Sequence, residues 1–462
     1  MPRRYDTRYD FDLIVIGTGA GGNVAAHIAN SKGKRVALFE REAVVGGECP
    51  NWGCVPTKAL LNAAEHYKSG QNAPNFGIKV GSLGYDYKKV RAYKTKVVER
   101  TGTADGDETF RKSGIKVIHS DAHFLNRHEV TASGKRYTAK NFVIATGTSD
   151  FIPPVEGLTE SGYITFKEAI DLKQPPKSLL VIGGGAIGCE FTELFTSFGS
   201  KVHLVEAMPR LLGREEPEAA DLLKALFENR GVKVHTGALV TKVAKKASKK
   251  EVTISVDGKN HTVLVDEVLV ASGKRPNVDF GLDNAGVVYD PKRGIKTNEF
   301  MQTTARNIFA AGDVVGPYQF THTASYQSRI AAMNILHQKS NWEKADYRAV
   351  PRCVFVDPEI ASVGITEAEA RDKKIHVRVG MAPISIIGRS NTTDRSTGFV
   401  KIITNHRRVI IGATVYSPNA GEMIHELALA IHMRVTADTI AKLIHAFPTW
   451  SESIRIAAGR VK

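Results

Sequence analysis

At two points along the chain, a short apolar run leads directly into a glycine-rich turn. The first run, Asp12–Ile16, precedes GTGAGG, and the second, Leu179–Ile182, precedes GGGAIG. Each turn is followed by a helical pattern and then by an apolar strand pattern that ends in an acid, Glu40 in the first copy and Glu206 in the second. Strand, glycine turn, helix and acid-terminated strand make up a dinucleotide-binding unit, so the pattern predicts two such units.

Each position of the first copy has a mechanical task. Gly17 makes the tight turn, Gly19 lets the backbone approach a pyrophosphate, and Gly22 lets the helix pack on the strand. Glu40 is placed to accept hydrogen bonds from ribose hydroxyls. A glycine turn that binds nothing is the alternative, and the flanking strand, helix and acid count against it. The same tasks are predicted in the second copy for Gly183, Gly185, Gly188 and Glu206.

The second acid bears on the choice of nicotinamide. A carboxylate suits the 2′-hydroxyl of NAD and repels a 2′-phosphate. Arg210, four residues beyond Glu206, would weaken that repulsion. We therefore expect NADH to be preferred, with NADPH as the alternative.

The last quarter of the chain mixes strands and helices. Pro351–Val363 and Gly398–Val415 carry strand-like patterns, and Met423–His432 and Ala437–Ala446 carry helical ones. With 462 residues, 42% hydrophobic and 24% charged, the chain is typical of a globular protein of several domains. No apolar run reaches the roughly 18 residues that a membrane span needs, and no signal peptide is evident, so we expect a cytoplasmic protein without a membrane span.

Charge raises the question of nucleic-acid binding. The 63 Lys and Arg residues exceed the 48 Asp and Glu residues by 15. The dense basic runs, Lys245–Lys250 and His406–Arg408, lie between strand patterns where exposed turns are expected. No nucleic-acid-binding motif accompanies them. We expect general attraction for anionic ligands and no specific nucleic-acid partner.

Between the two repeats lies GGECPNWGCVPTK, which holds two of the four cysteines. Cys49 and Cys54 can come within disulfide distance in a bent helical turn. A bridge over so short a loop stabilises a fold by only about 2 kcal/mol, so a structural disulfide explains them poorly. Zinc needs about four ligands, and Cys189 and Cys353 stand alone, so we expect no bound metal. Pro56 is typical of a first helical turn, which would place Cys54 at a helix N-terminus and favour a redox-active pair.

This segment resembles the active-site signature of the FAD-dependent pyridine nucleotide–disulfide oxidoreductases, the family of dihydrolipoamide dehydrogenase and mercuric reductase. Further resemblances follow in order along the chain: VIATG at Val143–Gly147, VLVASGKRPN at Val268–Asn277, IFAAGD at Ile308–Asp313, and Pro448-Thr449 with Ser451-Glu452. The resemblance implies an α/β protein with two Rossmann-type domains, for FAD and NAD(P), and a C-terminal α+β dimerisation domain. It implies FAD segments at 1–150 and 275–348, an NAD(P) domain at 151–274 and an interface domain at 349–462. It also implies a homodimer in which each interface domain completes the partner's active site.

The resemblance also assigns roles. Cys54 corresponds to the thiol next to the flavin, Cys49 to the thiol that attacks the substrate, and Lys58 and Glu190 to an ion pair near the flavin and the nicotinamide. The resemblance further places Thr146, Gly147, Asp313 and His322 at FAD and Gly273 at the nicotinamide nucleotide. Packing is an equally good explanation for His322.

Two departures from the family pattern concern the acceptor. Dithiol-using members have a general base, oriented by a Glu, where this chain has Phe447; a phenyl ring takes no proton, and losing such a base costs about 10²–10⁴-fold in rate. Glu452 would then orient nothing, and His445 matches a neighbouring His in the family. Mercuric reductases carry a C-terminal cysteine pair that passes the metal inward, whereas no cysteine follows Cys353 in this sequence. We also expect no N-terminal metal-binding extension, so we do not expect a mercuric reductase, although a soft metal ion could still meet Cys49 and Cys54.

The resulting hypothesis is a flavin-dependent oxidoreductase. It passes electrons from NADH through FAD and a Cys49–Cys54 disulfide to a small-molecule acceptor: a quinone, a reactive oxidant, a metal ion or an unusual disulfide. A dihydrolipoamide dehydrogenase with a displaced base is one alternative. A flavoprotein redox sensor with little turnover is another.

Overall fold

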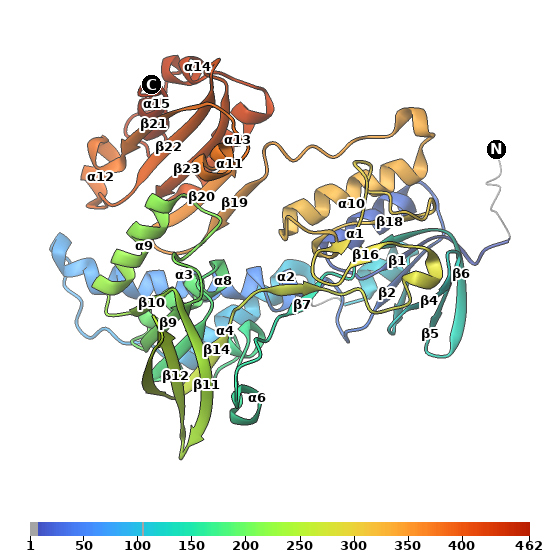
Figure 1. Ribbon diagram of the computed structural model, residues 1–462, viewed down its shortest axis with the longest axis horizontal. Helices are drawn as coiled ribbons and strands as arrows, with labels where there is room; N and C mark the ends of the chain where they lie inside the picture. Colours follow the sequence, from blue (N-terminus) through green and yellow to red (C-terminus); the bar gives the residue numbers. More distant parts are fainter. Residues whose placement is uncertain (1–7, 104–105) are drawn as a thin grey trace. The chain divides into compact units, whose positions relative to one another are not determined.

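The computed structural model describes residues 8–103 and 106–462, and the charged residues 1–7 lie outside this part (Figure 1). The chain divides into two compact units. The first combines residues 8–59, 89–151 and 273–345, and the second combines residues 60–88, 152–272 and 346–462.

The first unit is built on a seven-stranded sheet in the order β3-β2-β1-β6-β5-β4, with β18 also paired to β6. β1, β2, β3, β18 and the second half of β6 run parallel, and the first half of β6 turns antiparallel to β5. The central strands are apolar along their whole length because both faces are covered. The strands are β1 (Phe11–Ile16), β2 (Val36–Glu40), β3 (Lys116–His119), β4 (His123–Asn126), β5 (Glu129–Ala132), β6 (Lys135–Ile144) and β18 (Ile308–Ala310).

Two helices lie side by side on this sheet, α1 (Ala20–Ser31) and α10 (Thr321–Leu336) (Figure 1). Small residues allow their close approach: Ala25, Ala26 and Ala29 of α1 are buried. Shorter elements and two small sheets complete this part of the chain: α2 (Glu48–Asn51), α5 (Glu108–Lys112), β7 (Thr148–Asp150) with β15 (Lys274–Pro276), and β16 (Tyr289–Asp290) with β17 (Gly294–Ile295). Two further helices belong partly to each unit: α3 (Cys54–Asn72) to the second from residue 60, and α4 (Tyr87–Val98) to the first from residue 89.

The second unit holds the second glycine motif on a parallel sheet in the order β10-β9-β8-β14. An antiparallel sheet, β11-β12-β13, lies in the chain between β10 and β14 of the parallel sheet. The elements are β8 (Ser178–Ile182), β9 (Lys201–Glu206), β10 (Lys233–Thr236), β14 (Glu267–Val270), β11 (Ala238–Lys246), β12 (Lys249–Val256), β13 (Lys259–Val265), α6 (Leu158–Ser161), α7 (Phe166–Ala169), α8 (Ala186–Ser197) and α9 (Pro217–Asn229).

The same unit ends in a five-stranded antiparallel sheet, β19-β20-β23-β22-β21, covered by helices. Its core includes Ile402, Val415, Ile424 and Leu427, which are fully buried. The elements are β19 (Pro351–Val354), β20 (Glu359–Gly364), β21 (Val377–Pro383), β22 (Phe399–Asn405), β23 (Ile410–Ser417), α11 (Glu367–Asp372), α12 (Gly388–Thr393), α13 (Ala420–His432), α14 (Ala437–Lys442) and α15 (Glu452–Gly459).

These architectures confirm the predicted fold class, two Rossmann-type sheets with a C-terminal α+β part. Both basic runs lie at hairpin turns, between β11 and β12 and between β22 and β23, as predicted. The helix predicted for Ala437–Ala446 is shorter: α14 ends at Lys442, and Leu443 is already extended. The change of direction lets the His445 side chain reach Glu426 on α13.

Across the described residues, no helix has the length and apolar character needed to cross a membrane.

Candidate active site

The first glycine turn joins β1 to α1 and has no room for a side chain at Gly17 or Gly22. Gly17 has φ +101°, and a Cβ added there would lie 2.2 Å from the Ala145 carbonyl oxygen. A Cβ at Gly22 would lie 1.8 Å from the Gly17 carbonyl oxygen. α1 begins with no side-chain cap and no acid in its first turn. Its exposed amides and its dipole therefore favour an anionic group such as the FAD pyrophosphate.

The second turn, between β8 and α8, repeats this geometry. Gly183 has φ +111°, and a Cβ at Gly188 would lie 1.9 Å from the Gly183 carbonyl oxygen. At Gly185 a Cβ would meet no atom within 4 Å. Gly183 and Gly188 are therefore needed for the fold itself, whereas Gly185 faces open space that the pyrophosphate of a nucleotide can enter.

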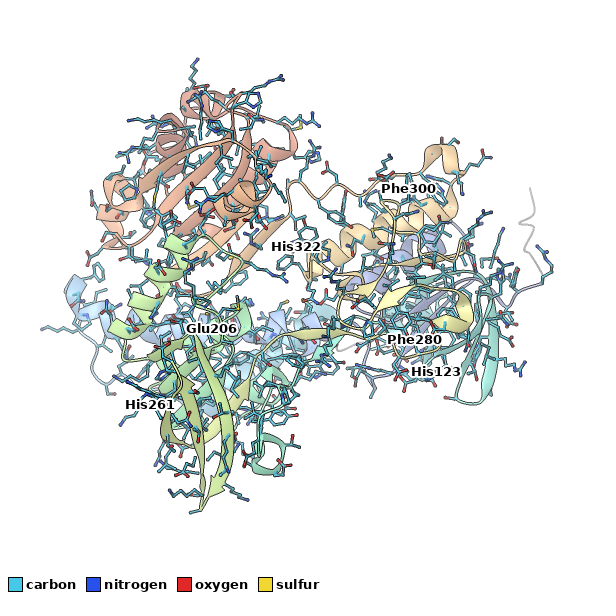
Figure 2. All side chains as sticks on the ribbon, viewed as in Figure 1. His123, Glu206, His261, Phe280, Phe300 and His322 are labelled. Carbon is cyan, nitrogen blue, oxygen red and sulfur yellow. The ribbon has the colours of Figure 1, made fainter. Side chains whose placement is uncertain are left out.

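The acid at each strand end is bonded to its own glycine turn. One oxygen of Glu40 accepts from the Thr18 amide at 3.1 Å, and the other accepts from the Glu42 amide at 3.0 Å. Glu206, labelled in Figure 2, does the same with the amides of Gly184 at 2.6 Å and Met208 at 2.7 Å. The two copies thus share an atomic pattern as well as a motif. The carboxylates keep acceptor capacity for ribose hydroxyls.

The two cysteines lie at the junction of α2 and α3, which begins at Cys54 as the first-turn Pro56 predicted. The Glu48 carbonyl accepts from the Trp52 amide at 2.8 Å and the Gly53 amide at 2.7 Å. The Asn51 side chain donates to the carbonyls of Val45 and Gly47. This hydrogen-bonded turn brings together two cysteines that are five residues apart.

The structure describes both cysteines as thiols, Cys49 half-buried and Cys54 exposed. The hydrogen bond with the Cys54 thiol, followed by burial, raises the pKa of Cys49 well above its usual range. The Cys54 sulfur lies 3.7 Å from the hydroxyl of Thr321, the first residue of α10. The Thr321 side chain also forms a hydrogen bond with Cys49. Sequence reasoning missed Thr321, although it directly precedes the predicted site residue His322.

Asp313 follows β18 in the segment that resembles the second flavin motif. Burial, with the charge of Glu48 as the next cause, raises the pKa of Asp313 to about 6. The Lys274 ammonium opposes this shift. It donates to both oxygens of Glu48, at 2.8 and 2.9 Å, and lies 3.0 Å from Asp150. Sequence reasoning also missed Lys274, within GKRPN.

The other residues predicted to bind FAD belong to the same unit. Thr146 donates to the Asn277 carbonyl at 2.8 Å, and the Asn277 amide donates to the Gly147 carbonyl at 3.0 Å. These bonds join VIATG to GKRPN, whose Gly273 has φ +114°. The ring of His322, labelled in Figure 2, stacks on Phe320 with centroids 5.3 Å apart.

Lys58 and Glu190 occupy different units. Lys58 is half-buried on α3. Glu190 is buried on α8 and accepts from the Phe355 amide at 3.1 Å. Their ion pair stays a prediction.

The C-terminal segment presents an aromatic ring. Phe447 is 75% exposed, and its ring lies so close to Gly388 that a Cβ there would approach it to 3.0 Å. The Glu452 carboxylate accepts from the Thr449 amide at 3.3 Å. His445 bonds through Nε2 to Glu426 at 3.1 Å and through Nδ1 to the Leu443 carbonyl at 3.2 Å. Both His445 nitrogens are therefore engaged with groups other than Phe447.

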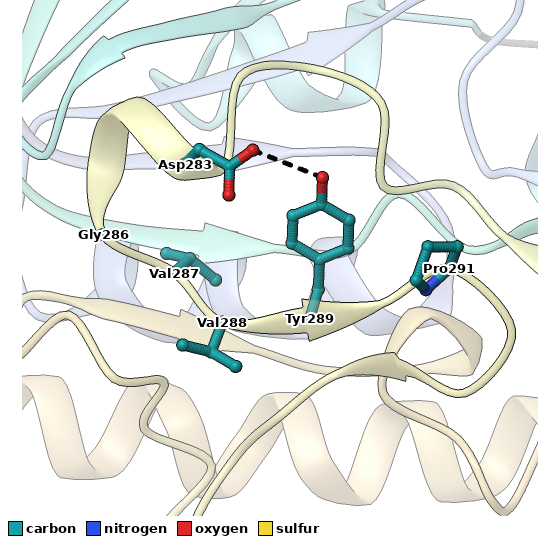
Figure 3. A pocket seen from close by; sticks show the side chains of 6 residues that line it. All are labelled: Asp283, Gly286, Val287, Val288, Tyr289 and Pro291. Atoms are coloured by element: carbon teal, nitrogen blue, oxygen red, sulfur yellow. Dashed lines mark hydrogen bonds between the residues drawn. The ribbon is translucent and has the colours of Figure 1, made fainter.

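A pocket elsewhere in the first unit contains none of the predicted site residues (Figure 3). The Tyr289 hydroxyl there donates to Asp283 at 3.4 Å. Its lining consists of Asp283, Gly286, Val287, Val288, Tyr289 and Pro291.

Comparison with known families identifies the class of protein. Residues 11–328 match the family model described as pyridine nucleotide-disulphide oxidoreductase, and residues 350–458 match the dimerisation domain of the same family. The chain belongs to the pyridine nucleotide–disulphide oxidoreductases, and it is an oxidoreductase of a flavoprotein family that uses FAD and NAD(P). The resemblance noted from the cysteine signature is thereby confirmed.

Individual relatives fall into three groups. The chain is 33% identical to a mercuric reductase of Staphylococcus aureus over 97% of this chain and 82% of the relative. It is 35% identical to a dihydrolipoyl dehydrogenase of Geobacillus stearothermophilus over 98% of this chain and 96% of the relative. The Escherichia coli HOCl-induced flavoprotein disulfide reductase RclA superposes with a TM-score of 0.86 at 28% identity, covering 98% of this chain and 100% of that one. A Cu(II) complex of RclA superposes with a TM-score of 0.84 at 28% identity over 96% and 98% of the two chains.

Proposed function

We propose that this enzyme passes electrons from NADH through FAD and the Cys49–Cys54 pair to an acceptor other than a dithiol, with a thiophilic metal ion as the first candidate. The observation that carries the proposal is the contact between the two thiols in the α2–α3 turn. A pair held this closely can open and close a disulfide without rearranging the backbone.

FAD, when bound, accepts hydride from the nicotinamide and exchanges electrons with a disulfide. The chain's part is to hold and orient. The first glycine turn and Glu40 would hold the adenosine diphosphate half of FAD, and Asp313 would accept from its ribityl chain. The second glycine turn and Glu206 would hold the nicotinamide nucleotide, with Lys58 and Glu190 near the site of hydride transfer.

The two thiols are expected to divide their tasks. The raised pKa of Cys49 means that it keeps its proton when the disulfide is reduced, so the negative charge falls on Cys54. This supports Cys54 as the thiolate next to the flavin and Cys49 as the thiol that meets the acceptor. The assignment agrees with the one that the family resemblance implies.

Phe447 limits which electron acceptors the site can use. Its phenyl ring cannot deprotonate a dithiol, and His445 and Glu452 are engaged elsewhere. Two adjacent sulfur ligands suit a soft metal ion. The relatives include mercuric reductases, and RclA forms a Cu(II) complex. Cu(II) is therefore the first acceptor to test, ahead of quinones, reactive oxidants and unusual disulfides.

A dihydrolipoamide dehydrogenase is the second candidate, because several relatives carry that name. It would need a base that Phe447 does not provide. Replacing Phe447 with His should raise dihydrolipoamide oxidation by about tenfold or more, since a general base contributes about 10²–10⁴-fold. Phe447→Leu, which changes the ring without adding a base, is the matched control. Equal turnover in both variants would show that the missing base does not limit dithiol chemistry.

The main test is an anaerobic NADH titration of the flavin-loaded protein, with Cys49→Ser and Cys54→Ser in parallel. We expect a long-wavelength charge-transfer band after two electrons, absent in Cys54→Ser. Direct bleaching of the flavin in the wild type would contradict a role for the cysteines. Continuous NADH consumption with Cu(II) would distinguish an enzyme from a sensor, which stops after one reduction.

A further inference from the structure

Lys274 is surrounded by acids in the first unit. Its side chain is 11% exposed and contacts two carboxylates, those of Glu48 and Asp150. A third, Asp313, lies close enough for the Lys274 charge to influence its pKa. One ammonium therefore acts on three carboxylates, and Glu48 and Asp150 both lie far from Lys274 in the sequence, Glu48 by 226 residues.

Glu48 connects this cluster to the cysteine turn. It directly precedes Cys49, and its carbonyl accepts the two amides that lead into Cys54. A Cβ at Gly53 would lie 3.2 Å from that carbonyl oxygen and 3.4 Å from the Cys49 Cα, so the turn is tightly packed around Glu48. Holding the Glu48 side chain therefore holds the backbone on which both sulfurs are carried.

We propose that Lys274 is a positioning residue for the redox turn. Through Glu48 it fixes the backbone of Cys49 and Cys54, and its positive charge stabilises the thiolate that forms there on reduction. The proposal rests on the proposed function, in which the two cysteines alternate between disulfide and dithiol.

The charge balance predicts the direction in which each substitution shifts the equilibrium between disulfide and dithiol. Reduction breaks the S–S bond with two electrons and one proton, and it yields the Cys49 thiol and the Cys54 thiolate. The new negative charge acts on Asp313, because the charge of Cys54 also raises the pKa of Asp313. It forms on the turn that the Glu48 carbonyl holds. Removing Lys274 would disfavour the dithiol form, and removing the charge of Glu48 would favour it.

The test compares Lys274→Met and Glu48→Gln in the flavin-loaded protein. Each variant is equilibrated with dithiothreitol at mildly alkaline pH. Dithiothreitol supplies the two electrons when it closes its own ring disulfide. It releases two protons, and one of them is taken up by the enzyme. The fraction of dithiol is read by thiol alkylation and mass spectrometry. We expect Lys274→Met to shift the equilibrium toward the disulfide, and Glu48→Gln to shift it toward the dithiol, each by about threefold or more.

Two further variants control for charge and for packing. Lys274→Arg keeps the charge and should restore the wild-type equilibrium to within about twofold. Lys296→Met removes one exposed lysine from the same unit and should change nothing. Shifts in the same direction for Lys274→Met and Glu48→Gln, or no shift in either, would overturn the proposal.

Two measurements separate this inference from the proposed function. If Lys274→Met does not retain flavin, Glu48→Gln and Asp150→Asn are used to test the proposal in its place. The absence of a shift toward the dithiol in both of these variants would overturn the proposal. The equilibrium with dithiothreitol involves no NADH. Failure of NADH to produce the charge-transfer band in the wild type would therefore refute the proposed electron path, while the opposed shifts would still support Lys274.

Discussion

Glu206 has two tasks at the end of β9. It braces its own glycine turn through the amides of Gly184 and Met208, and it is the residue that we expect to select the nicotinamide. Arg210, the residue that could weaken this selection, is exposed and contributes to lowering the pKa of Glu218. The Arg210 charge therefore also acts on Glu218.

Replacing Glu206 with Gln should reduce the preference for NADH over NADPH by about tenfold or more. Gln still accepts from the Gly184 amide, but it loses the charge that strengthens hydrogen bonds from ribose and repels a 2′-phosphate. The measurement is kcat/KM for both nucleotides.

Glu40→Gln is the matched control, because it makes the same change at the same position of the first copy. In flavin-loaded protein it should leave the ratio of the two kcat/KM values unchanged. An unchanged ratio in Glu206→Gln as well would remove Glu206 from nicotinamide selection.

At the scale of elements, the second glycine turn separates folding from binding. Gly188 packs α8 against β8 at a distance that excludes any side chain, whereas Gly185 at the helix start has no neighbour within 4 Å. Two glycines of one motif are thus needed for different reasons.

We therefore expect opposite outcomes from two alanine substitutions. Gly188→Ala should destabilise the fold by a few kcal/mol, because its Cβ would overlap the Gly183 carbonyl oxygen. Gly185→Ala should leave the unfolding midpoint unchanged but weaken NADH binding, because its Cβ enters the space that the pyrophosphate needs. Denaturant unfolding and NADH titration measure the two effects. Loss of stability in Gly185→Ala, or normal NADH affinity in it, would contradict this division.

A second relation between elements is the buried lysine of β22. Lys401 is 2% exposed and bonds to Glu216 at the start of α9, Glu218 on α9 and Glu367 on α11. These carboxylates could be mistaken for a cation site, but the Lys401 ammonium lies among them. Burial opposes charge on Lys401, but its hydrogen bonds to the acids raise its pKa overall.

Lys401→Met should lower the free energy of unfolding at neutral pH by about 3–5 kcal/mol, because it leaves the buried Glu216 carboxylate without a counter-charge. The pH dependence should also change sign. In the wild type, burial works against the charge of Glu218, but the bond from Lys401 holds the pKa of Glu218 below its usual 4.5. Its stabilising contribution is present above that value and is lost as pH falls through the lowered pKa. In the variant, protonation relieves repulsion, so stability should rise as pH falls.

Denaturant unfolding at several pH values measures both effects. Lys246→Met removes the lysine of an exposed pair with Glu251 and should cost less than about 1 kcal/mol. A loss of similar size in the two variants, or a wild-type pH slope in Lys401→Met, would contradict the role given to the buried cluster.

At the scale of the whole molecule, the dimerisation-domain match supports a homodimer. The C-terminal part exposes large apolar side chains that a single chain leaves in water. Ile444 is 95% exposed and Phe447 75%, and further examples are Met433, Leu429 and Leu443. Burying such residues against a second copy would offset their contact with water.

Ile444→Asp should therefore shift the protein from dimer to monomer in sedimentation velocity, because it places a charge in the expected interface. Leu239→Asp is the control. Leu239 is 56% exposed on β11, outside the dimerisation domain, and its replacement should leave the dimer intact. A dimer in Ile444→Asp with the wild-type dissociation constant would show that Ile444 lies outside the interface.

Much of the fold and part of the site follow from local physics and were predictable from the sequence. The strand-end acids and the helix start at Cys54 depend on contacts within about twenty residues, where sterics and backbone hydrogen bonds leave few alternatives. The glycine motifs are recognised from their own spacing, although Gly17 also packs against Ala145 from a distant part of the chain. The basic runs lie at turns for a similar reason, because a hairpin connection positions its own flanking strands. The first connection, between Lys246 and Lys249, has two residues, and the second, between Asn405 and Ile410, is longer.

Tertiary structure decided what surrounds those motifs. Thr321 meets Cys54 across 267 residues, and Lys274 meets Glu48 across 226. His445, beyond the end of α14, bonds to Glu426 on α13. No sequence pattern predicts these three contacts, because Lys, Thr and His occur in many roles and their partners depend on how distant elements pack. The sequence alone therefore predicted which residues would carry the redox chemistry, and the packed fold determined the charges and hydrogen bonds that surround them.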